Sequence, residues 1–116
     1  VEDEPLIAVD LEVAITEAGA VVVGPAHTLV QAMHLGENEL LDGAIVDMRL
    51  RGESAVPLLV RLVGRSIPCI VHSGHSALTS SDEWPHAVPV VSKPASVEAV
   101  LNALRLEMTR LAARQE

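Results

Sequence analysis

Apolar residues follow two different spacings along the chain, and these spacings predict its secondary structure. A spacing of three or four residues, typical of a helix with one buried face, occurs in four segments: 5–18, 28–36, 54–63 and 97–111. Short apolar runs indicate four buried strands between these segments: 21–23, 43–46, 68–71 and 88–91. Helices that alternate with strands favour a parallel sheet with right-handed crossovers and helices on both faces. The segment 76–84 is compatible with a short helix or with a loop.

Residues with strong positional preferences mark the ends of these elements. Pro5 fits the first turn of a helix, where its missing N–H costs no hydrogen bond, and Gly19 ends that helix. Thr28 and Ser54 are expected to cap the next two helices with their hydroxyl oxygens. Pro89 interrupts the pattern of the last strand, which favours a position at the edge of the sheet.

The first five residues have the pattern of a strand end followed by a turn into a helix. Val1 has the character of the last residue of a strand, and residues 2–5 that of the turn. In a doubly wound sheet this first strand would be central, so its loss would be severely destabilising. We therefore expect either that the sequence is truncated and largely lacks this strand, or that the strand is supplied from elsewhere.

Length and composition predict one globular domain, residues 1–116, with an aliphatic core. Hydrophobic residues make up 49% of the 116, which excludes general disorder, and Trp84 is the only aromatic residue. The single cysteine, Cys69, forms no disulfide framework and no cysteine-based zinc site, and this usage fits a reducing cytoplasm. No apolar run approaches the ~18–20 residues that cross a bilayer, and no signal-peptide pattern opens the chain.

Charge is distributed unevenly along the sequence. The formal net charge is −8, a poor match for a surface that binds nucleic acid. All basic side chains of Lys and Arg come from Arg49 onward, whereas the region before it is rich in Asp and Glu. Lys93 is the only lysine of the chain, which argues against an ordinary surface role for it.

Polar residues follow four of the predicted strands at the point where each strand ends. They are Glu2–Asp3, Asp47, Ser73–Gly74 and Lys93–Pro94. Because ligands of open α/β sheets bind at the carboxyl ends of the strands, we expect the sheet to bring these four groups together. Three neighbouring carboxylates need a cation, and oxygen ligands of this kind suit Mg²⁺. With a lysine, a hydroxyl and an unobstructed glycine N–H, the set describes a phosphoryl pocket with a carboxylate nucleophile.

Four short motifs resemble the receiver domain of two-component response regulators. They are Val-Glu-Asp-Glu-Pro at 1–5, Ala-Ile-Val-Asp-Met-Arg-Leu at 44–50, Val-His-Ser-Gly-His at 71–75 and Ser-Lys-Pro at 92–94. Their order along nearly the whole chain is what makes the signal specific. The resemblance implies a flavodoxin-like, doubly wound, five-stranded parallel sheet of order 2-1-3-4-5, with the first strand largely missing here. Residues 2–25 also resemble a bacterial subgroup of stand-alone receivers.

The resemblance implies a phosphorylated aspartate and a magnesium site. Asp47 matches the residue that accepts a phosphoryl group from a histidine kinase or a phosphotransfer protein. Asp3 matches a direct metal ligand, Glu2 the neighbouring acid that usually acts through water, and the backbone carbonyl of Arg49 the third protein ligand. Asp47 itself also lies on the metal.

The resemblance further implies how the phosphoryl group is held. Ser73 and Lys93 match the hydroxyl and the lysine that contact it, with Gly74 beside them, and the bond from Lys93 to Pro94 is expected to be cis. Catalysis would consist mainly of positioning and charge neutralisation. The added charge would draw Ser73 and Lys93 inward and bias the loops that follow the third and fourth of the predicted strands.

One position departs from the pattern of the family. Receivers usually carry an aromatic residue three positions before the lysine, and its rotamer reports phosphorylation. That position is Val90 here, so the usual aromatic relay cannot operate. The resemblance implies a cytoplasmic signalling module and not a metabolic enzyme, with an unidentified output partner, no direct nucleic-acid or membrane binding and a possible homodimer.

Two other functions are compatible with the same fold. An interaction module that ignores phosphate is one, and Val90 is the feature that favours it. An aspartate-nucleophile phosphohydrolase is the other, although such enzymes typically need a second acid two residues after the nucleophile, where Arg49 stands.

Each candidate residue also has a simpler interpretation. Carboxylates at 2–4 suit a helix start, Asp47 and Ser73–Gly74 suit turns, and a lysine suits a solvated surface. His72 and His75 lack the further ligands that zinc needs, so we interpret them as loop histidines near the pocket. Cys69 lies in a predicted buried strand and is expected in the core.

Overall fold

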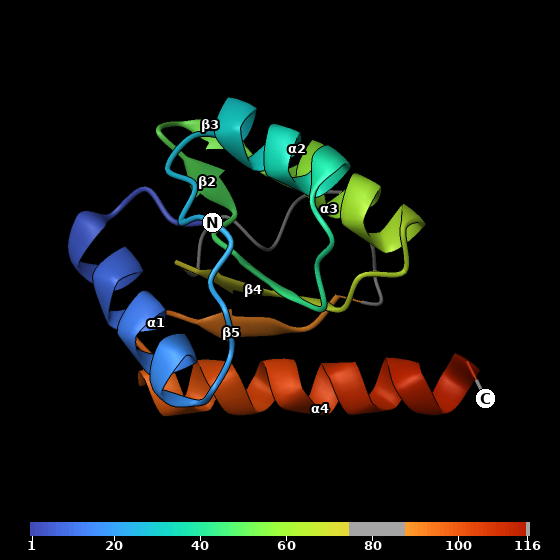
Figure 1. The fold of residues 1–116 in the computed structure, drawn as a ribbon. Helices are drawn as coiled ribbons and strands as arrows, with labels where there is room; N and C mark the ends of the chain where they lie inside the picture. Colours follow the sequence, from blue (N-terminus) through green and yellow to red (C-terminus); the bar gives the residue numbers. More distant parts are fainter. Residues whose placement is uncertain (75–87, 116) are drawn as a thin grey trace.

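A parallel sheet of three strands forms the centre of the computed structural model, which describes residues 1–74 and 88–115 (Figure 1). The strands are β1 (Ala44–Val46), β4 (Cys69–Ser73) and β5 (Val90–Ser92), in the order β1-β4-β5. Both neighbouring pairs are parallel, with Val46 opposite Val71 and Val71 opposite Val90. The strand that contains Val90 is therefore at the edge of the described sheet, as Pro89 predicts.

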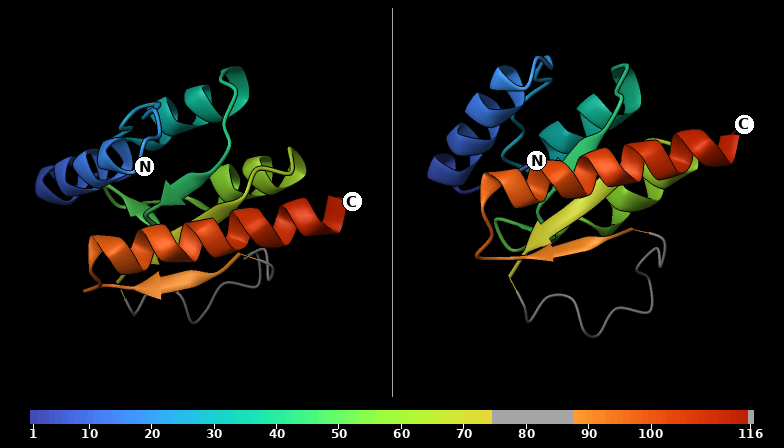
Figure 2. Two further views of the ribbon diagram at one scale, coloured as in Figure 1. Left: turned by 60° about the horizontal axis from the view of Figure 1, so that its bottom comes forward. Right: turned by 90° about the horizontal axis from the view of Figure 1, so that it is seen from below.

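Helices cover both faces of this sheet, as the alternation of helices and strands predicts (Figure 1). The helices α1 (Pro5–Glu17) and α4 (Val97–Gln115) lie on one face, and α2 (Leu29–Asn38) and α3 (Val56–Gly64) lie on the other. Figure 2 shows α4 passing in front of β4 when the molecule is seen from below, and α4 also contacts β5. No helix among residues 1–74 and 88–115 is long and apolar enough to span a bilayer.

Side chains of the strands alternate between two aliphatic clusters. Ile45 and Ile70 point into the cluster formed with α1 and α4, whereas Val46 and Val71 point into the larger cluster formed with α2 and α3. Cys69 belongs to the larger cluster and is buried, as the sequence predicts. Strands buried on both faces need apolar residues at successive positions, which explains the short β-branched runs.

The helices begin at the residues that the sequence predicts, with one exception. Pro5 is the first residue of α1, and the Thr28 hydroxyl accepts a hydrogen bond of 3.2 Å from the Gln31 N–H at the start of α2. Ser54 was expected to be the cap of the next helix, but Ala55 occupies that position. The Ser54 hydroxyl still accepts a hydrogen bond of 3.2 Å from the Val56 N–H, from a strand that precedes the helix.

A hairpin that the sequence does not announce lies between β1 and α3. Its strands β2 (Arg49–Leu50) and β3 (Glu53–Ser54) are antiparallel and are joined by Arg51 and Gly52. Both turn residues have positive φ, 51° and 84°, as a two-residue hairpin turn of type I′ requires. Arginine is an uncommon residue at such a position, so the turn carries only half of its usual sequence signal.

The predicted strand at 21–23 is not a strand in the structure. Val21 is 88% exposed and Val23 is 41% exposed, and the segment belongs to neither described sheet. A strand needs a neighbouring edge for its backbone hydrogen bonds. Among the described residues, the ladder beside β1 reaches this part of the chain only through the hydrogen bond from the Glu2 N–H to the Ala26 carbonyl, so residues 21–23 themselves have no strand partner. The ambiguous segment 76–84, with Trp84, and His75 lie outside the described residues.

Candidate functional site

Val1 and Glu2 lie between β1 and the segment that precedes α2. Their backbone hydrogen bonds hold the acidic residues of the site in position. The Val1 nitrogen donates a hydrogen bond of 2.7 Å to the Ile45 carbonyl, and the Asp47 N–H donates one of 2.9 Å to the Val1 carbonyl. On the other side, the Glu2 N–H donates to the Ala26 carbonyl at 2.9 Å. Glu2 and Asp47 are thereby held at the same carboxyl-terminal edge of the sheet, as expected from the strand ends.

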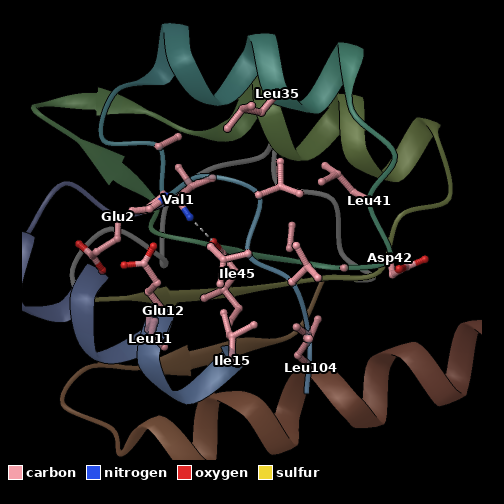
Figure 3. Close-up of a pocket in the computed structure, with 18 of the residues that line it drawn as sticks. Val1, Glu2, Leu11, Glu12, Ile15, Leu35, Leu41, Asp42, Ile45 and Leu104 are labelled. Atoms are coloured by element: carbon pink, nitrogen blue, oxygen red, sulfur yellow. Dashed lines mark hydrogen bonds between the residues drawn. The ribbon is translucent and has the colours of Figure 1, made fainter. Parts of the chain in front are cut away.

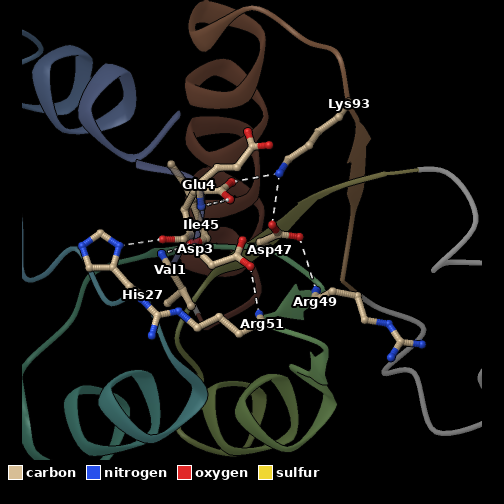
Figure 4. Close-up of polar contacts among 10 residues, drawn as sticks. Val1, Asp3, Glu4, His27, Ile45, Asp47, Arg49, Arg51 and Lys93 are labelled. Atoms are coloured by element: carbon tan, nitrogen blue, oxygen red, sulfur yellow. Dashed lines mark hydrogen bonds and ion pairs between the residues drawn. The ribbon is translucent and has the colours of Figure 1, made fainter. Parts of the chain in front are cut away.

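Three carboxylates from these two chain segments form a compact acidic cluster (Figure 4). Each of Glu2, Asp3 and Asp47 offers an oxygen, and the three oxygens lie within 4.8 Å of one another. Glu2 is 2% exposed and Asp47 is 6% exposed, whereas Asp3 is partly exposed. Carboxylates at such a separation repel one another, so the arrangement favours a cation or protonation.

Lys93 supplies a positive charge to two of these carboxylates. It follows β5, and its Nζ lies 3.0 Å from Glu2 Oε1 and 3.0 Å from Asp47 Oδ2 (Figure 4). Its own N–H donates a hydrogen bond of 2.9 Å to the Ser73 carbonyl, which ties the ends of β4 and β5 together. The Lys93 side chain is 22% exposed, so its ammonium reaches the cluster from the edge of the site.

Backbone N–H groups also point at the three carboxylates, and no sequence pattern indicates these contacts. The Glu4 N–H lies 3.1 Å from Glu2 Oε2, and the Arg49 N–H lies 3.3 Å from Asp47 Oδ1. The Arg51 N–H donates to Asp3 Oδ2 at 2.8 Å. This last contact comes from the β2–β3 turn, whose weak sequence signal explains why it was missed.

His27 is a second residue that the sequence analysis missed. Its Nδ1 donates a hydrogen bond of 2.9 Å to the Glu2 carbonyl, which supports the backbone of the acidic segment from the side opposite β1 (Figure 4). The contact joins residues 25 positions apart, so local sequence patterns give no sign of it. His27 positions the site and does not face the carboxylate oxygens.

Burial and like charge change the protonation of the site. Desolvation, together with the neighbouring Asp47, raises the pKa of Glu2 to about 7. Burial alone would lower the pKa of Lys93, but hydrogen bonds to Glu2 and Asp47 outweigh it, so this pKa is raised. Burial lowers the pKa of the Val1 amino group to about 6. Near neutral pH, Glu2 therefore exchanges a proton easily while Lys93 keeps its charge.

The remaining predicted residues belong to the hairpin and to the ends of β4 and β5. Ser73 is the last residue of β4 and is buried, and Gly74 follows it with open space where a Cβ would stand. The Lys93–Pro94 peptide bond is cis. The Arg49 guanidinium extends away from the three carboxylates (Figure 4), and Val90 is 39% exposed at the edge of the sheet.

His72 lies one residue before Ser73 and is 5% exposed. Among the described residues, neither of its ring nitrogens has a hydrogen-bond partner. Burial, with the Lys93 charge, lowers the pKa of His72. The side chain is thus a buried neutral imidazole in a strand, and its position differs from the loop location that we expected.

The parallel sheet with helices on both faces, and the three carboxylates and one lysine at its edge, define the class of protein: an α/β domain with a charged site at the ends of its strands. Comparisons with solved structures give the family. The solution structure of SdrG from Sphingomonas melonis Fr1 is 33% identical, over 90% of this chain and 91% of SdrG, with a TM-score of 0.73. A CheY-like response regulator receiver domain from Methanospirillum hungatei JF-1 is 20% identical, over 97% and 93%, with a TM-score of 0.83.

A third structure is a receiver domain of a sensor histidine kinase from Pseudomonas aeruginosa PAO1, which holds a magnesium ion in its active-site cleft. It is 21% identical, over 94% of this chain and 93% of that one, with a TM-score of 0.76. No family model matches the sequence, and no curated protein matches it. The chain belongs to the response regulator receiver family. Its fold class is flavodoxin-like, as expected.

Proposed function

We propose that Asp47 accepts a phosphoryl group from a phosphohistidine of a histidine kinase or a phosphotransfer protein. In this step the P–N bond of the donor breaks and a P–O bond to an Asp47 carboxylate oxygen forms. The contact of Lys93 Nζ with Asp47 Oδ2, at 3.0 Å and beside two further carboxylates, is the observation that carries the proposal. Transfer of this kind depends mainly on positioning and neutralisation of charge, which these contacts supply.

The donor atoms also fit a magnesium ion. All three side chains of the cluster are carboxylates, and Mg²⁺ prefers oxygen ligands of this kind. Asp3 and Asp47 would bind the ion directly, with the Arg49 carbonyl as a third protein ligand and Glu2 through water. The ion would neutralise charge on the phosphoryl oxygens during transfer. The magnesium in the Pseudomonas aeruginosa receiver supports this assignment.

Ser73, Gly74 and Lys93 would hold the phosphoryl group after transfer. Ser73 offers a hydroxyl, Gly74 an N–H that no side chain obstructs, and Lys93 an ammonium that already faces Asp47. The hydrogen bond from the Lys93 backbone N–H to the Ser73 carbonyl keeps these two residues next to each other at the ends of β4 and β5. We further propose that residues 1–116 form one receiver domain that works in the cytoplasm and changes its affinity for an output partner.

A direct chemical test uses a small phosphodonor such as acetyl phosphate. We expect that, with Mg²⁺ present, the protein gains the mass of one phosphoryl group in an adduct stable to acid and labile to base. The adduct should be absent when EDTA replaces Mg²⁺ and in Asp47→Asn. Asp42→Asn is the matched control, because Asp42 is an exposed acid outside the cluster. Labelling of Asp47→Asn to the level of the control would overturn the proposal, and steady turnover of a phosphate monoester would favour the phosphohydrolase.

A receiver-like interaction module remains the second candidate because of Val90. This valine is 39% exposed at the edge strand, where the family usually carries an aromatic switch residue. If Asp47 is phosphorylated and the affinity for the output partner does not change, the interaction module is the correct function. If the affinity changes, the switch operates without an aromatic residue.

A further inference from the structure

Asp3 lies just beyond the backbone hydrogen bonds that hold the acidic segment. Those bonds belong to Val1 and Glu2, and Figure 3 shows the one from Val1 to Ile45 at the edge of a cavity beside β1. Asp3 itself is partly exposed, in the bend that leads into α1. Among the described residues its carboxylate accepts one hydrogen bond, of 2.8 Å from the Arg51 N–H. The position of this carboxylate therefore depends on the turn between β2 and β3.

The Arg51 N–H is available to Asp3 because of the type of turn. In a two-residue hairpin turn, the N–H groups of the turn residues take no part in the ladder between the strands, so each needs an acceptor elsewhere. Arg51 and Gly52 have the positive φ values that such a turn requires, and the Arg51 N–H points at Asp3 Oδ2. The donor is main chain, so the contact needs the conformation of Arg51 and not its guanidinium.

The hairpin is fixed to the core of the protein and can therefore act as a support. Leu50 of β2 is 1% exposed and belongs to the larger aliphatic cluster. At the base of the hairpin, the Ala55 N–H donates a hydrogen bond of 2.8 Å to the Met48 carbonyl. The same hairpin contacts a second carboxylate, because the Arg49 N–H lies 3.3 Å from Asp47 Oδ1. Core packing is thus transmitted to two of the three acidic side chains.

We propose that the β2–β3 hairpin is the positioning element of the magnesium site, and that its turn at Arg51–Gly52 sets the place of Asp3. This inference rests on the proposed function, in which Asp3, Asp47 and the Arg49 carbonyl are the direct ligands. Hydrogen-bond partners that orient the ligands of a metal typically contribute roughly ten- to hundredfold to its affinity. Arg51 acts through Asp3, so it is a positioning residue and not a ligand.

The test compares two glycines with the same backbone conformation. Gly52 and Gly19 have φ values of 84° and 90°, and a Cβ at either position would meet nothing within 4 Å. Gly19 follows α1 at the end of that helix opposite Asp3. Valine is strongly disfavoured at such φ values, so Gly52→Val and Gly19→Val should lose similar stability. We expect Gly52→Val to bind Mg²⁺ roughly tenfold more weakly than Gly19→Val in a calorimetric titration.

Two substitutions of Arg51 separate the role of its main chain from that of its side chain. Asparagine adopts a positive φ readily, whereas a β-branched residue such as valine does not. We expect Arg51→Asn to keep most of the wild-type affinity for Mg²⁺ and Arg51→Val to bind it roughly tenfold more weakly. Equal weakening in the two variants would assign the effect to the guanidinium and would overturn the proposal.

Hydrogen exchange of the Arg51 amide measures the contact directly in the metal-free protein, without any change to the turn. Asp3→Ala removes the acceptor and should speed this exchange by roughly tenfold or more. Asp42→Ala, at an exposed acid outside the cluster, should leave it unchanged. Unchanged exchange in Asp3→Ala would overturn the inference, as would equal Mg²⁺ affinities of Gly52→Val and Gly19→Val. A wild-type protein that binds no Mg²⁺ would instead overturn the proposed metal site, and this inference with it, so the two failures are distinguishable.

Discussion

Lys93 Nζ and Asp47 Oδ2 lie 3.0 Å apart, although 46 positions separate the two residues in sequence. The same ammonium lies 3.0 Å from Glu2 Oε1, so one lysine offsets the charge of two almost fully buried carboxylates. Asp47 follows β1 and Lys93 follows β5, and the parallel arrangement of the strands brings both residues to the same edge of the sheet.

Replacing Lys93 by Met should impair both stability and phosphorylation. The variant leaves two buried carboxylates without their ammonium partner, which we expect to cost about 2 kcal/mol of unfolding free energy. Labelling of Asp47 by acetyl phosphate should fall by at least roughly tenfold, because a transition-state charge loses its partner. Denaturant unfolding and a labelling time course measure the two effects. Arg61→Met is the control, because Arg61 forms an exposed ion pair with Glu37, and equal losses in both variants would contradict the prediction.

Glu2 should make Mg²⁺ binding depend on pH near neutrality. The pKa of Glu2 is about 7 in the folded protein, compared with a reference value of 4.5. Between these two pH values the metal-free folded protein therefore holds a proton on Glu2 that the unfolded chain releases. The contribution of Glu2 to stability therefore falls as pH rises from about 4.5 to 7. Mg²⁺ competes with that proton, so its affinity should rise as pH increases through 7.

Thermal unfolding with and without Mg²⁺ across this pH range checks the prediction. The Val1 amino group, with its pKa lowered from 8.0 to about 6, adds stability as pH rises from 6 to 8 and so acts in the opposite direction. Comparison with Glu2→Gln separates the two groups, because that variant keeps the contribution of Val1. If the steep pH dependence of Mg²⁺ affinity persists in Glu2→Gln, Glu2 is not its cause and the prediction is wrong.

His72 should make the protein sensitive to mild acid. In the folded state, burial lowers the pKa of His72 below its reference value of 6.5. The unfolded chain therefore takes up the proton more readily than the folded one. The stability that this provides is present above about pH 6.5 and is lost as pH falls through the lowered pKa. We expect His72→Leu to reduce this loss and to raise stability near pH 7 by about 1 kcal/mol, since it removes two ring nitrogens that lack partners among the described residues.

The measurement is urea unfolding between about pH 5 and 7.5. His34→Leu is the control, because His34 lies exposed on α2. An identical acid sensitivity of the wild-type protein and His72→Leu would show that His72 does not carry it.

Gly36 and Gly64 should respond in opposite ways to replacement by alanine. Each lies in a helix, where alanine is favoured over glycine by about 1 kcal/mol. A Cβ at Gly36 would lie 3.1 Å from Leu58 Cδ1, which is tighter than an ordinary contact, so the buried Leu58 side chain would have to shift. At Gly64 a Cβ meets nothing within 4 Å.

We therefore expect Gly64→Ala to raise the unfolding free energy by about 0.5–1 kcal/mol and Gly36→Ala to lower it by about 1 kcal/mol or more. Denaturant unfolding of both variants decides the matter. A gain in stability for Gly36→Ala would mean that α2 and α3 adjust at little cost.

The sequence was most informative where one residue type serves a local physical need. Periodic apolar residues located the four described helices, Thr28 located a cap, and Pro89 located an edge strand. The site was predictable because its side chains follow strands, and the ends of parallel strands meet at one edge. That Lys93 and Asp47 lie close together in space could be inferred from the strand ends alone, without knowing how the loops run.

The unpredicted features depend on tertiary contacts between loops. The Arg51 N–H reaches Asp3 from a hairpin whose turn contains an unusual arginine, and His27 reaches the Glu2 carbonyl from a distant segment. The segment 21–23 has strand-like residues but lacks a full partner edge. Local propensity describes what a segment prefers, whereas pairing depends on what lies beside it.

The hydrogen bond from the Lys93 N–H to the Ser73 carbonyl has a mechanical consequence. It couples the residue that reaches Asp47 to the last residue of the neighbouring strand through a peptide group, with no aromatic ring between them. If a phosphoryl group on Asp47 displaced the Lys93 ammonium, the ends of β4 and β5 would shift together. If Asp47 is phosphorylated as proposed, this main-chain hydrogen bond offers a route from the site to the ends of β4 and β5 in a chain with valine at position 90.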